Sequence, residues 1–137
     1  MNIVQQKIDA LENILAALPQ TDIPVQHTNA GGMAARTILL EKGTILTGAI
    51  HLSAHLNVVH GDITIVGENG ARRYTGAHVI ASEPGTKRVG FVHAPTTWTT
   101  IVKTDETDPE TIKAQMTAAR FDDPRLAADQ PLEMIGE

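Results

Sequence analysis

The chain has 137 residues, a length typical of one domain, and its net charge of −5 argues against a nucleic-acid partner, which usually selects a basic surface. It contains no cysteine, which excludes disulfides and thiolate metal ligands and fits a cytoplasmic protein. The 42% of hydrophobic residues can form an aliphatic core, but neither a signal peptide nor a membrane-spanning run is visible, so no membrane partner is expected.

A helix is expected over residues 1–18. Its apolar residues alternate in spacing between four and three, which places them on one stripe: Val4, Ile8, Leu11, Leu15 and Leu18. Pro19 follows and ends the pattern, because proline cannot continue a helix without losing a hydrogen bond. The stripe predicts packing against the domain or, as an alternative, a short helix contact in an oligomer.

A β-domain is expected over residues 34–104, after a linker at 20–33 that contains a proline and two glycines. Within the domain, short apolar segments alternate with turn signals, of which Asn69-Gly70 is the strongest. The strands are expected at 36–40, 44–51, 56–59, 62–66, 72–75, 78–81, 88–93 and 97–103. Short strands at such regular spacing indicate an antiparallel sandwich or barrel.

An acidic helical arm and tail are expected over residues 105–137. The segment 109–120 has a thin apolar face and begins in an acidic run, which favours a helix because carboxylates stabilise the N-terminal turn. The remaining residues are polar and contain proline, so the tail is expected to be mobile or to dock on a partner.

Three histidines lie within ten residues, at His51, His55 and His60. Neutral imidazole is the commonest protein ligand for divalent metals, so the spacing indicates a metal site. We expect His51 and His55 as ligands with His93 or His60 as the third, a set that suits Zn, Ni, Mn or Fe. The alternative is that no metal is bound and that these imidazoles line a cavity and form hydrogen bonds with Asn57 or a small ligand.

Two pairs of basic residues suggest a site for a small anion. Lys87-Arg88 follows a turn, and Arg72-Arg73 lies on a strand that barrel topology would bring nearby. Guanidinium groups bind carboxylate and phosphate through paired hydrogen bonds, so a cavity containing arginine would suit a nucleotide, a sugar phosphate or a small acid. The alternative is that the basic pairs face solvent.

The order of glycines and histidines resembles the cupin superfamily of small jelly-roll β-barrels. Gly48, His51, His55 and Gly61 resemble its first motif, and Gly76, Pro84 and Gly85 resemble its second. The likeness is greatest to short cupin-like proteins of phage and bacterial genomes. It implies a mainly β protein: a single cupin-like jelly-roll barrel with an N-terminal helix and a C-terminal helical arm. It also implies a homodimer located in the cytoplasm. For a phage protein, this would be the cytoplasm of the host cell.

Two positions depart from the cupin pattern. His55 or Asn57 stands where the acidic ligand is expected, and Arg88 stands where the second motif has a histidine. A guanidinium has no free lone pair, so it cannot bind a metal. We therefore expect a small-molecule or metal-binding protein of unassigned activity, with His51, His55 and His93 for a metal and Asn57, Arg73, Lys87 and Arg88 for an anionic ligand. The alternative is a non-catalytic phage-type assembly, structural or inhibitor protein that acts through dimer and tail contacts.

Overall fold

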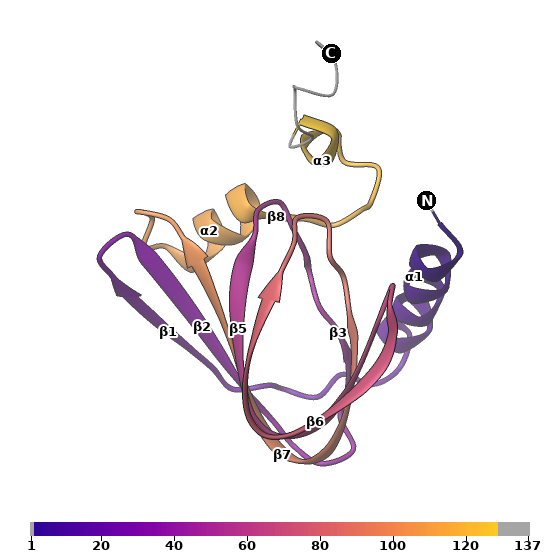
Figure 1. The fold of residues 1–137 in the computed structure, drawn as a ribbon. Helices are drawn as coiled ribbons and strands as arrows, with labels where there is room; N and C mark the ends of the chain where they lie inside the picture. Colours follow the sequence, from indigo (N-terminus) through magenta and orange to yellow (C-terminus); the bar gives the residue numbers. More distant parts are fainter. Residues whose placement is uncertain (1, 129–137) are drawn as a thin grey trace.

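In the computed structural model, which describes residues 2–128, the chain is mainly antiparallel β-structure with helices at both ends (Figure 1). The helices are α1 (Ile3–Ala16), α2 (Pro109–Met116) and α3 (Pro124–Ala128). The strands are β1 (Val25–Ala30), β2 (Met33–Leu40), β3 (Ile45–Thr47), β4 (Ile50–His51), β5 (His55–Gly67), β6 (Gly70–Ser82), β7 (Val89–Lys103) and β8 (Thr117–Ala118). The expected mainly β fold with helices at both ends is confirmed.

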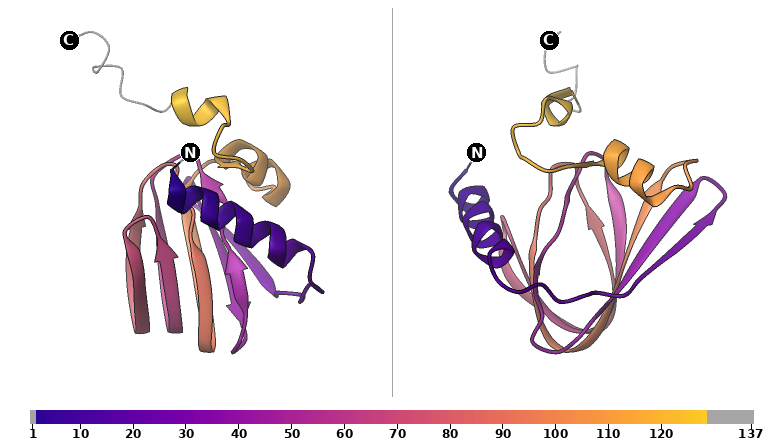
Figure 2. Two further views of the ribbon diagram at one scale, coloured as in Figure 1. Left: turned by 90° about the vertical axis from the view of Figure 1, so that its right-hand side faces the viewer. Right: turned by 180° about the vertical axis from the view of Figure 1, so that it is seen from behind.

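The main sheet has the strand order β1-β2-β7-β5-β6, with β3 also paired to β7. The two halves of strand β7 pair with different strands: the C-terminal half pairs with β2, and the N-terminal half pairs with β3. The sheet is strongly curved, so its two halves face each other and leave one end open (Figures 1 and 2). A small second sheet, formed by β4 and β8, lies at that open end.

The curvature is concentrated where Gly61 of β5 passes Pro95 and Thr96 of β7. The register of the β5–β7 pair shifts here, and the Thr96 hydroxyl accepts a hydrogen bond of 3.0 Å from the Asp62 backbone amide. Gly61 has a φ of +149° and is paired with Gly76, which has a φ of +80°. The sequence patterns at these glycines predicted turns between separate strands, but β5, β6 and β7 each continue through the bend.

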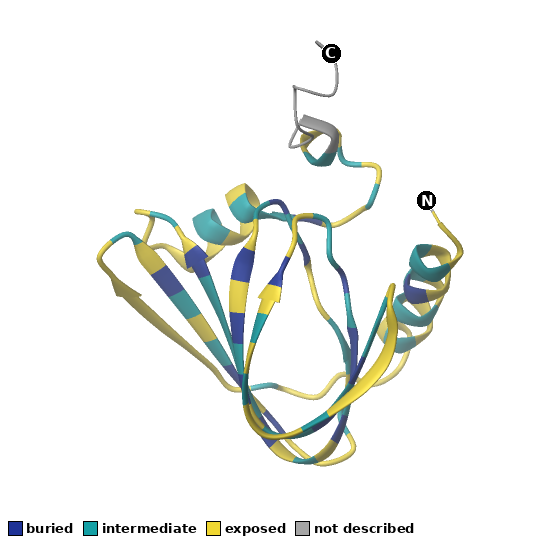
Figure 3. Ribbon diagram, in the orientation of Figure 1, coloured by how far each residue is buried: buried dark blue, intermediate teal, exposed yellow. Residues whose placement is uncertain are grey.

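The hydrophobic core fills the inside of the bend (Figure 3). Its buried residues alternate along the strands, as expected for strands with one face inward: Ile38, Leu40, Val59, Ile63, Ile65 and Val92. A smaller cluster joins the β4–β8 sheet to the C-terminal segment, with Ile50, Leu52 and Ala118 packed against Phe121 and Leu126. The first cluster therefore holds the curved sheet together, and the second attaches the C-terminal segment to it.

Three segments differ from the expected elements. The linker contains β1, so the sheet begins at Val25 rather than at residue 34. All six residues of β1 are exposed, and an edge strand of this kind lacks the alternating apolar pattern by which strands are recognised. The strand expected at 44–51 is split into β3 and β4, and the helix expected at 109–120 ends at Met116, where β8 begins.

Helix α1 lies on the outside of the curved sheet beside β3 (Figure 2). A capping box between Asn2 and Gln5 stabilises its N-terminus, and Ile8 of the predicted stripe is its buried residue. The Lys87 ammonium, itself buried, lies 2.8 Å from a carboxylate oxygen of Glu12, whose other oxygen accepts a hydrogen bond from Thr47. These contacts attach α1, which spans Ile3–Ala16, to the barrel.

None of the helices within residues 2–128 is long and apolar enough to cross a membrane. Part of the expected acidic arm is structured as α2, β8 and α3. The remainder of the tail, residues 129–137, lies outside the described residues, and its expected mobility or docking stays a prediction.

We predict that Gly61→Ala lowers the free energy of unfolding by about 3 kcal/mol, because a Cβ atom there would lie 2.6 Å from the Thr96 Cα. Gly76→Ala is the matched control: its φ is also positive, but nothing lies within 4 Å of the added atom, so a loss of about 1 kcal/mol is expected. Urea unfolding followed by circular dichroism measures both. Equal losses in the two variants would show that the bend does not depend on this close approach.

Candidate functional site

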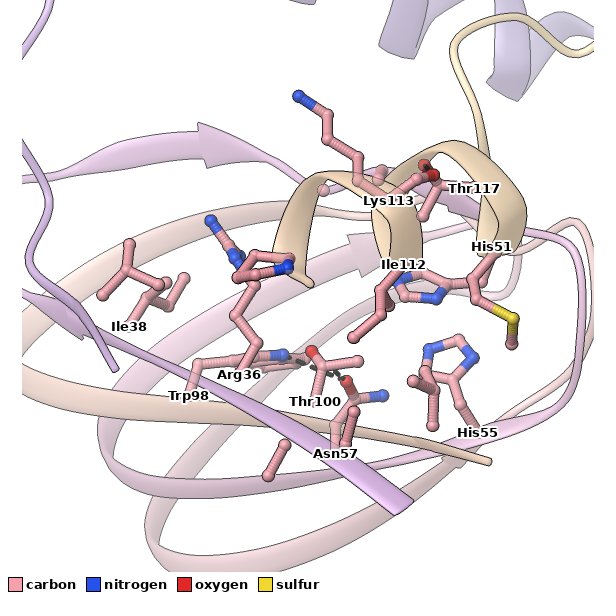
Figure 4. Close-up of a pocket in the computed structure, with 18 of the residues that line it drawn as sticks. Arg36, Ile38, His51, His55, Asn57, Trp98, Thr100, Ile112, Lys113 and Thr117 are labelled. Atoms are coloured by element: carbon pink, nitrogen blue, oxygen red, sulfur yellow. Dashed lines mark hydrogen bonds between the residues drawn. The ribbon is translucent and has the colours of Figure 1, made fainter. Parts of the chain in front are cut away.

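The open end of the barrel contains a cavity of about 640 Å³. The inner faces of β2, β3, β5 and β7 form its walls, and α2 lies over one side (Figure 4). Toward the bend the cavity meets apolar side chains, including Leu46, Ile63 and Ile65. Toward the mouth it meets a layer of polar side chains, which includes Arg36, His51, His55, Asn57, Arg88 and Thr100.

Asn57 organises the polar layer from its position on β5 (Figure 4). Its side-chain oxygen accepts hydrogen bonds of 3.1 Å from the Trp98 indole and the Thr100 hydroxyl, and its amide nitrogen donates one of 2.8 Å to the Ser82 hydroxyl. Asn57 is only 2% exposed, so this network satisfies a buried amide that would otherwise destabilise the fold. The predicted ligand residue Asn57 therefore lines the cavity but is largely occupied with neighbouring side chains.

Arg88, one of the residues expected to bind an anion, lies in the cavity wall. One of its guanidinium nitrogens donates a 2.6 Å hydrogen bond to the Ser82 hydroxyl, which links Arg88 to the Asn57 network. Partial burial lowers the pKa of Arg88, an effect opposed by Tyr74, but a guanidinium remains protonated at neutral pH. The side chain thus brings a fixed positive charge to the cavity.

A second arginine, Arg36, also lines the cavity. Its sequence pattern predicted a strand but not a ligand-binding role. It lies in one row of paired residues that runs across the sheet, from His27 through Arg36 and Thr100 to Asn57. The signal was present in the alternation of β2, because Arg36 has the parity of Ala34, Ile38 and Leu40, which are buried on the inner face. A charged residue at an inward position of a strand marks a cavity or a buried partner.

His51 and His55 lie against each other, with stacked rings whose centroids are 3.9 Å apart. Burial, followed by His55, Arg36 and Arg88, lowers the pKa of His51 from 6.5 to about 4. Burial also lowers the pKa of His55, although its hydrogen bond with the Ser53 carbonyl opposes this change. Both imidazoles are therefore neutral at pH 7, and His55 carries its proton on Nδ1 because Ser53 offers only an acceptor there.

The histidines do not form the expected metal site. His93 is exposed outside the cavity and contacts the Thr64 hydroxyl at 2.6 Å. A metal bound to imidazole lies in the plane of the ring, whereas the stacked rings of His51 and His55 direct their lone pairs along nearly parallel planes. Within residues 2–128 no group of three His, Cys, Asp or Glu side chains is placed to hold a metal ion, so the set His51, His55 and His93 does not fit one.

Two of the predicted anion-binding residues also lie elsewhere. Arg73 is exposed and makes a bidentate ion pair with Asp62, with both nitrogen–oxygen distances at 2.8 Å. Lys87 is directed to Glu12 of α1, although the adjacent Arg88 faces the cavity. Tertiary contacts thus neutralise Arg73 and Lys87 and leave Arg88 and Arg36 as the arginines that line the cavity.

No family model and no curated protein matches the sequence. Solved structures do resemble the fold. A cupin superfamily protein from Desulfitobacterium hafniense matches with a TM-score of 0.52 at 8% identity, over 64% of this chain and 83% of that one. KdgF from Halomonas sp. matches with a TM-score of 0.51 at 11% identity, over 61% and 80% of the two chains.

A protein described as ethanolamine utilization protein Q, from Salmonella typhimurium, matches with a TM-score of 0.50 at 9% identity. The match covers 61% of this chain and 71% of that one. At these identities the likeness concerns the fold alone. The chain therefore has the fold of cupin superfamily proteins.

The low pKa of His51 predicts a pH dependence of stability. The unfolded chain takes up the proton near pH 6.5 and the folded chain only near pH 4, so stability should fall as the pH drops between these values, by about 3 kcal/mol. His51→Asn should flatten this part of the curve, whereas His93→Asn, at an exposed site, should not. Proton NMR titration of the His51 ring gives the folded pKa directly, and a midpoint near 6.5 would contradict the prediction.

Proposed function

We propose that this protein binds a small anionic molecule in the barrel cavity. The observation that carries the proposal is the pair of guanidinium groups on Arg36 and Arg88, which have no carboxylate partner among residues 2–128. Four other cations pair with an acidic side chain: Arg73 with Asp62, Lys87 with Glu12, Arg120 with Asp122, and Arg125 with Asp123. Arg88 is partly buried, whereas Arg36 is exposed at the cavity. A partly buried charge without a partner destabilises the fold, and an anion bound at Arg88 would remove that penalty.

The other polar groups of the cavity support the proposal. His51 and His55 are neutral, so they provide hydrogen-bonding nitrogen atoms without a charge of their own. Lys113 on α2 also lines the cavity, and Figure 4 shows its ammonium directed away from the histidines. There it would attract an approaching anion through long-range electrostatics rather than hold it.

A screen of small carboxylates, phosphates and sulfate by thermal shift and calorimetry tests the proposal. At least one class should bind with saturation, and Arg88→Gln or Arg36→Gln should weaken that binding at least about tenfold, because a charge-assisted hydrogen bond is lost. Arg73→Gln is the matched control and should bind as the original protein does, since its guanidinium lies outside the cavity. Absence of saturable anion binding, or an equal loss in the control, would refute the proposal.

We also propose that two copies of the chain associate through the outer face of the sheet. Large apolar side chains are exposed on this face, among them Met33 (53%), Leu56 (46%) and Val79 (68%). Leu56 is paired with Ile101 and Ala81, and Val79 with Val58, so the apolar residues are contiguous across β6, β5 and β7. Helix α1 lies beside β3 and α2 lies over the cavity, so neither covers this face. A contiguous exposed apolar surface of this kind is typical of an interface.

This association predicts that the double substitution Leu56→Glu and Val79→Glu converts a dimer into a monomer, because it would bury four carboxylates in the interface. Light scattering after size exclusion measures the mass. Ile14→Glu provides the comparison, since Ile14 is 61% exposed on α1 and tests the alternative helix contact. A monomeric original protein, or a dimer disrupted only by Ile14→Glu, would rule out the sheet interface.

A further inference from the structure

Several hydrogen-bonding groups of the cavity wall are already engaged with neighbouring residues. The side-chain oxygen of Asn57 accepts from Trp98 and Thr100, and its amide donates to Ser82. Two further lining hydroxyls are also engaged, because Thr47 donates to Glu12 and Thr117 donates to the Lys113 carbonyl. These engaged groups would not replace the hydrogen bonds that a polyhydroxylated ligand such as a sugar makes with water.

A large part of the cavity surface is aliphatic. Leu46, Ile63 and Ile65 lie on the side toward the bend, below the polar layer. On the opposite side α2 contributes Ile112 and Met116, and Figure 4 shows Ile112 directed toward Thr100 and the histidines. A ligand in contact with the arginines would therefore have apolar walls on both sides, which favours a hydrocarbon body.

The helix N-terminus at the cavity, a kind of group that often binds phosphate, is not free to do so. The N-terminus of α2 lies at the cavity wall, but Asp108 already caps it by accepting from the Thr111 amide, and Glu110 adds a second negative charge. Anions bind at helix N-termini through free amides and a positive dipole, and both are compensated here. A singly charged carboxylate can be bound by the guanidinium groups alone, without a helix N-terminus.

We propose that the ligand is an aliphatic or aromatic monocarboxylic acid, with its carboxylate at Arg36 and Arg88 and its hydrocarbon body against Leu46, Ile63 and Ile65. This inference rests on the proposed anion-binding function and specifies its ligand class. His51 and His55 lie beside the carboxylate position as neutral groups, so they add no second charge that would select a dianion.

Calorimetry with acetate, butyrate, hexanoate and octanoate tests the inference on the unmodified protein. Each added CH2 group should tighten binding about fourfold until the apolar wall is covered, since burial of one CH2 contributes about 0.8 kcal/mol. Hexanamide, which has the same body without the charge, should bind at least about tenfold more weakly than hexanoate. Inorganic phosphate and ribose 5-phosphate complete the series and should bind more weakly than hexanoate.

A substitution in the roof of the cavity gives a second measurement. Ile112→Asn should weaken hexanoate binding severalfold and leave acetate binding nearly unchanged, because Ile112 lies at the cavity surface where a longer body would pass. Ile14→Asn makes the same change on an exposed part of α1 and is the matched control. Circular dichroism shows whether either variant is folded, and the chain-length series on the unmodified protein does not depend on them.

The outcomes separate this inference from the function on which it rests. Tighter binding of phosphate or ribose 5-phosphate than of hexanoate, or affinities that do not change with chain length, would overturn the monocarboxylate assignment and leave anion binding intact. Failure of every anion to bind would refute both.

Discussion

The close approach of Gly61 to Pro95 and Thr96 is the constraint on which the rest of the molecule depends. It allows β5 and β7 to bend together without separating, so one continuous sheet supplies two facing walls. The apolar core then fills the inside of the bend, and the polar layer lies above it toward the open end. The cavity is therefore a consequence of sheet curvature, and a side chain at Gly61 would affect the site from a distance.

Two basic residues that are neighbours in the sequence, Lys87 and Arg88, have different surroundings in the barrel. Lys87 attaches α1 through Glu12, whereas Arg88 enters the cavity and bonds to Ser82. The first contact is an ion pair that the fold completes by itself, and the second leaves a positive charge that the described residues do not neutralise. This difference separates a structural cation from one that is available to a ligand, and it underlies the proposed anion site.

Much of the fold could be predicted from the sequence, and less of the site. The alternation of Ile38 with Leu40 and of Ile63 with Ile65 identifies strands with one buried face, and the resemblance of the glycine and Pro-Gly positions to the cupin motifs implies a jelly roll. The exposed strand β1 was missed because it has no buried face to produce a pattern. The structure does not bring His93 to His51 and His55, because it lies on a different face, where it contacts Thr64.

The sequence by itself determined the β-rich class, the terminal helices and the shared face of His55 and Asn57, because side-chain alternation is a local property of a strand. Only the tertiary structure decided which cations face the cavity. Arg73 pairs with Asp62 across the β5–β6 hairpin, and Lys87 pairs with Glu12, which is distant in the chain. Arg36 is brought into the row of Thr100 and Asn57 by strand pairing. Ion pairs and cross-strand neighbours depend on how distant segments meet, and spacing along the chain does not contain that information.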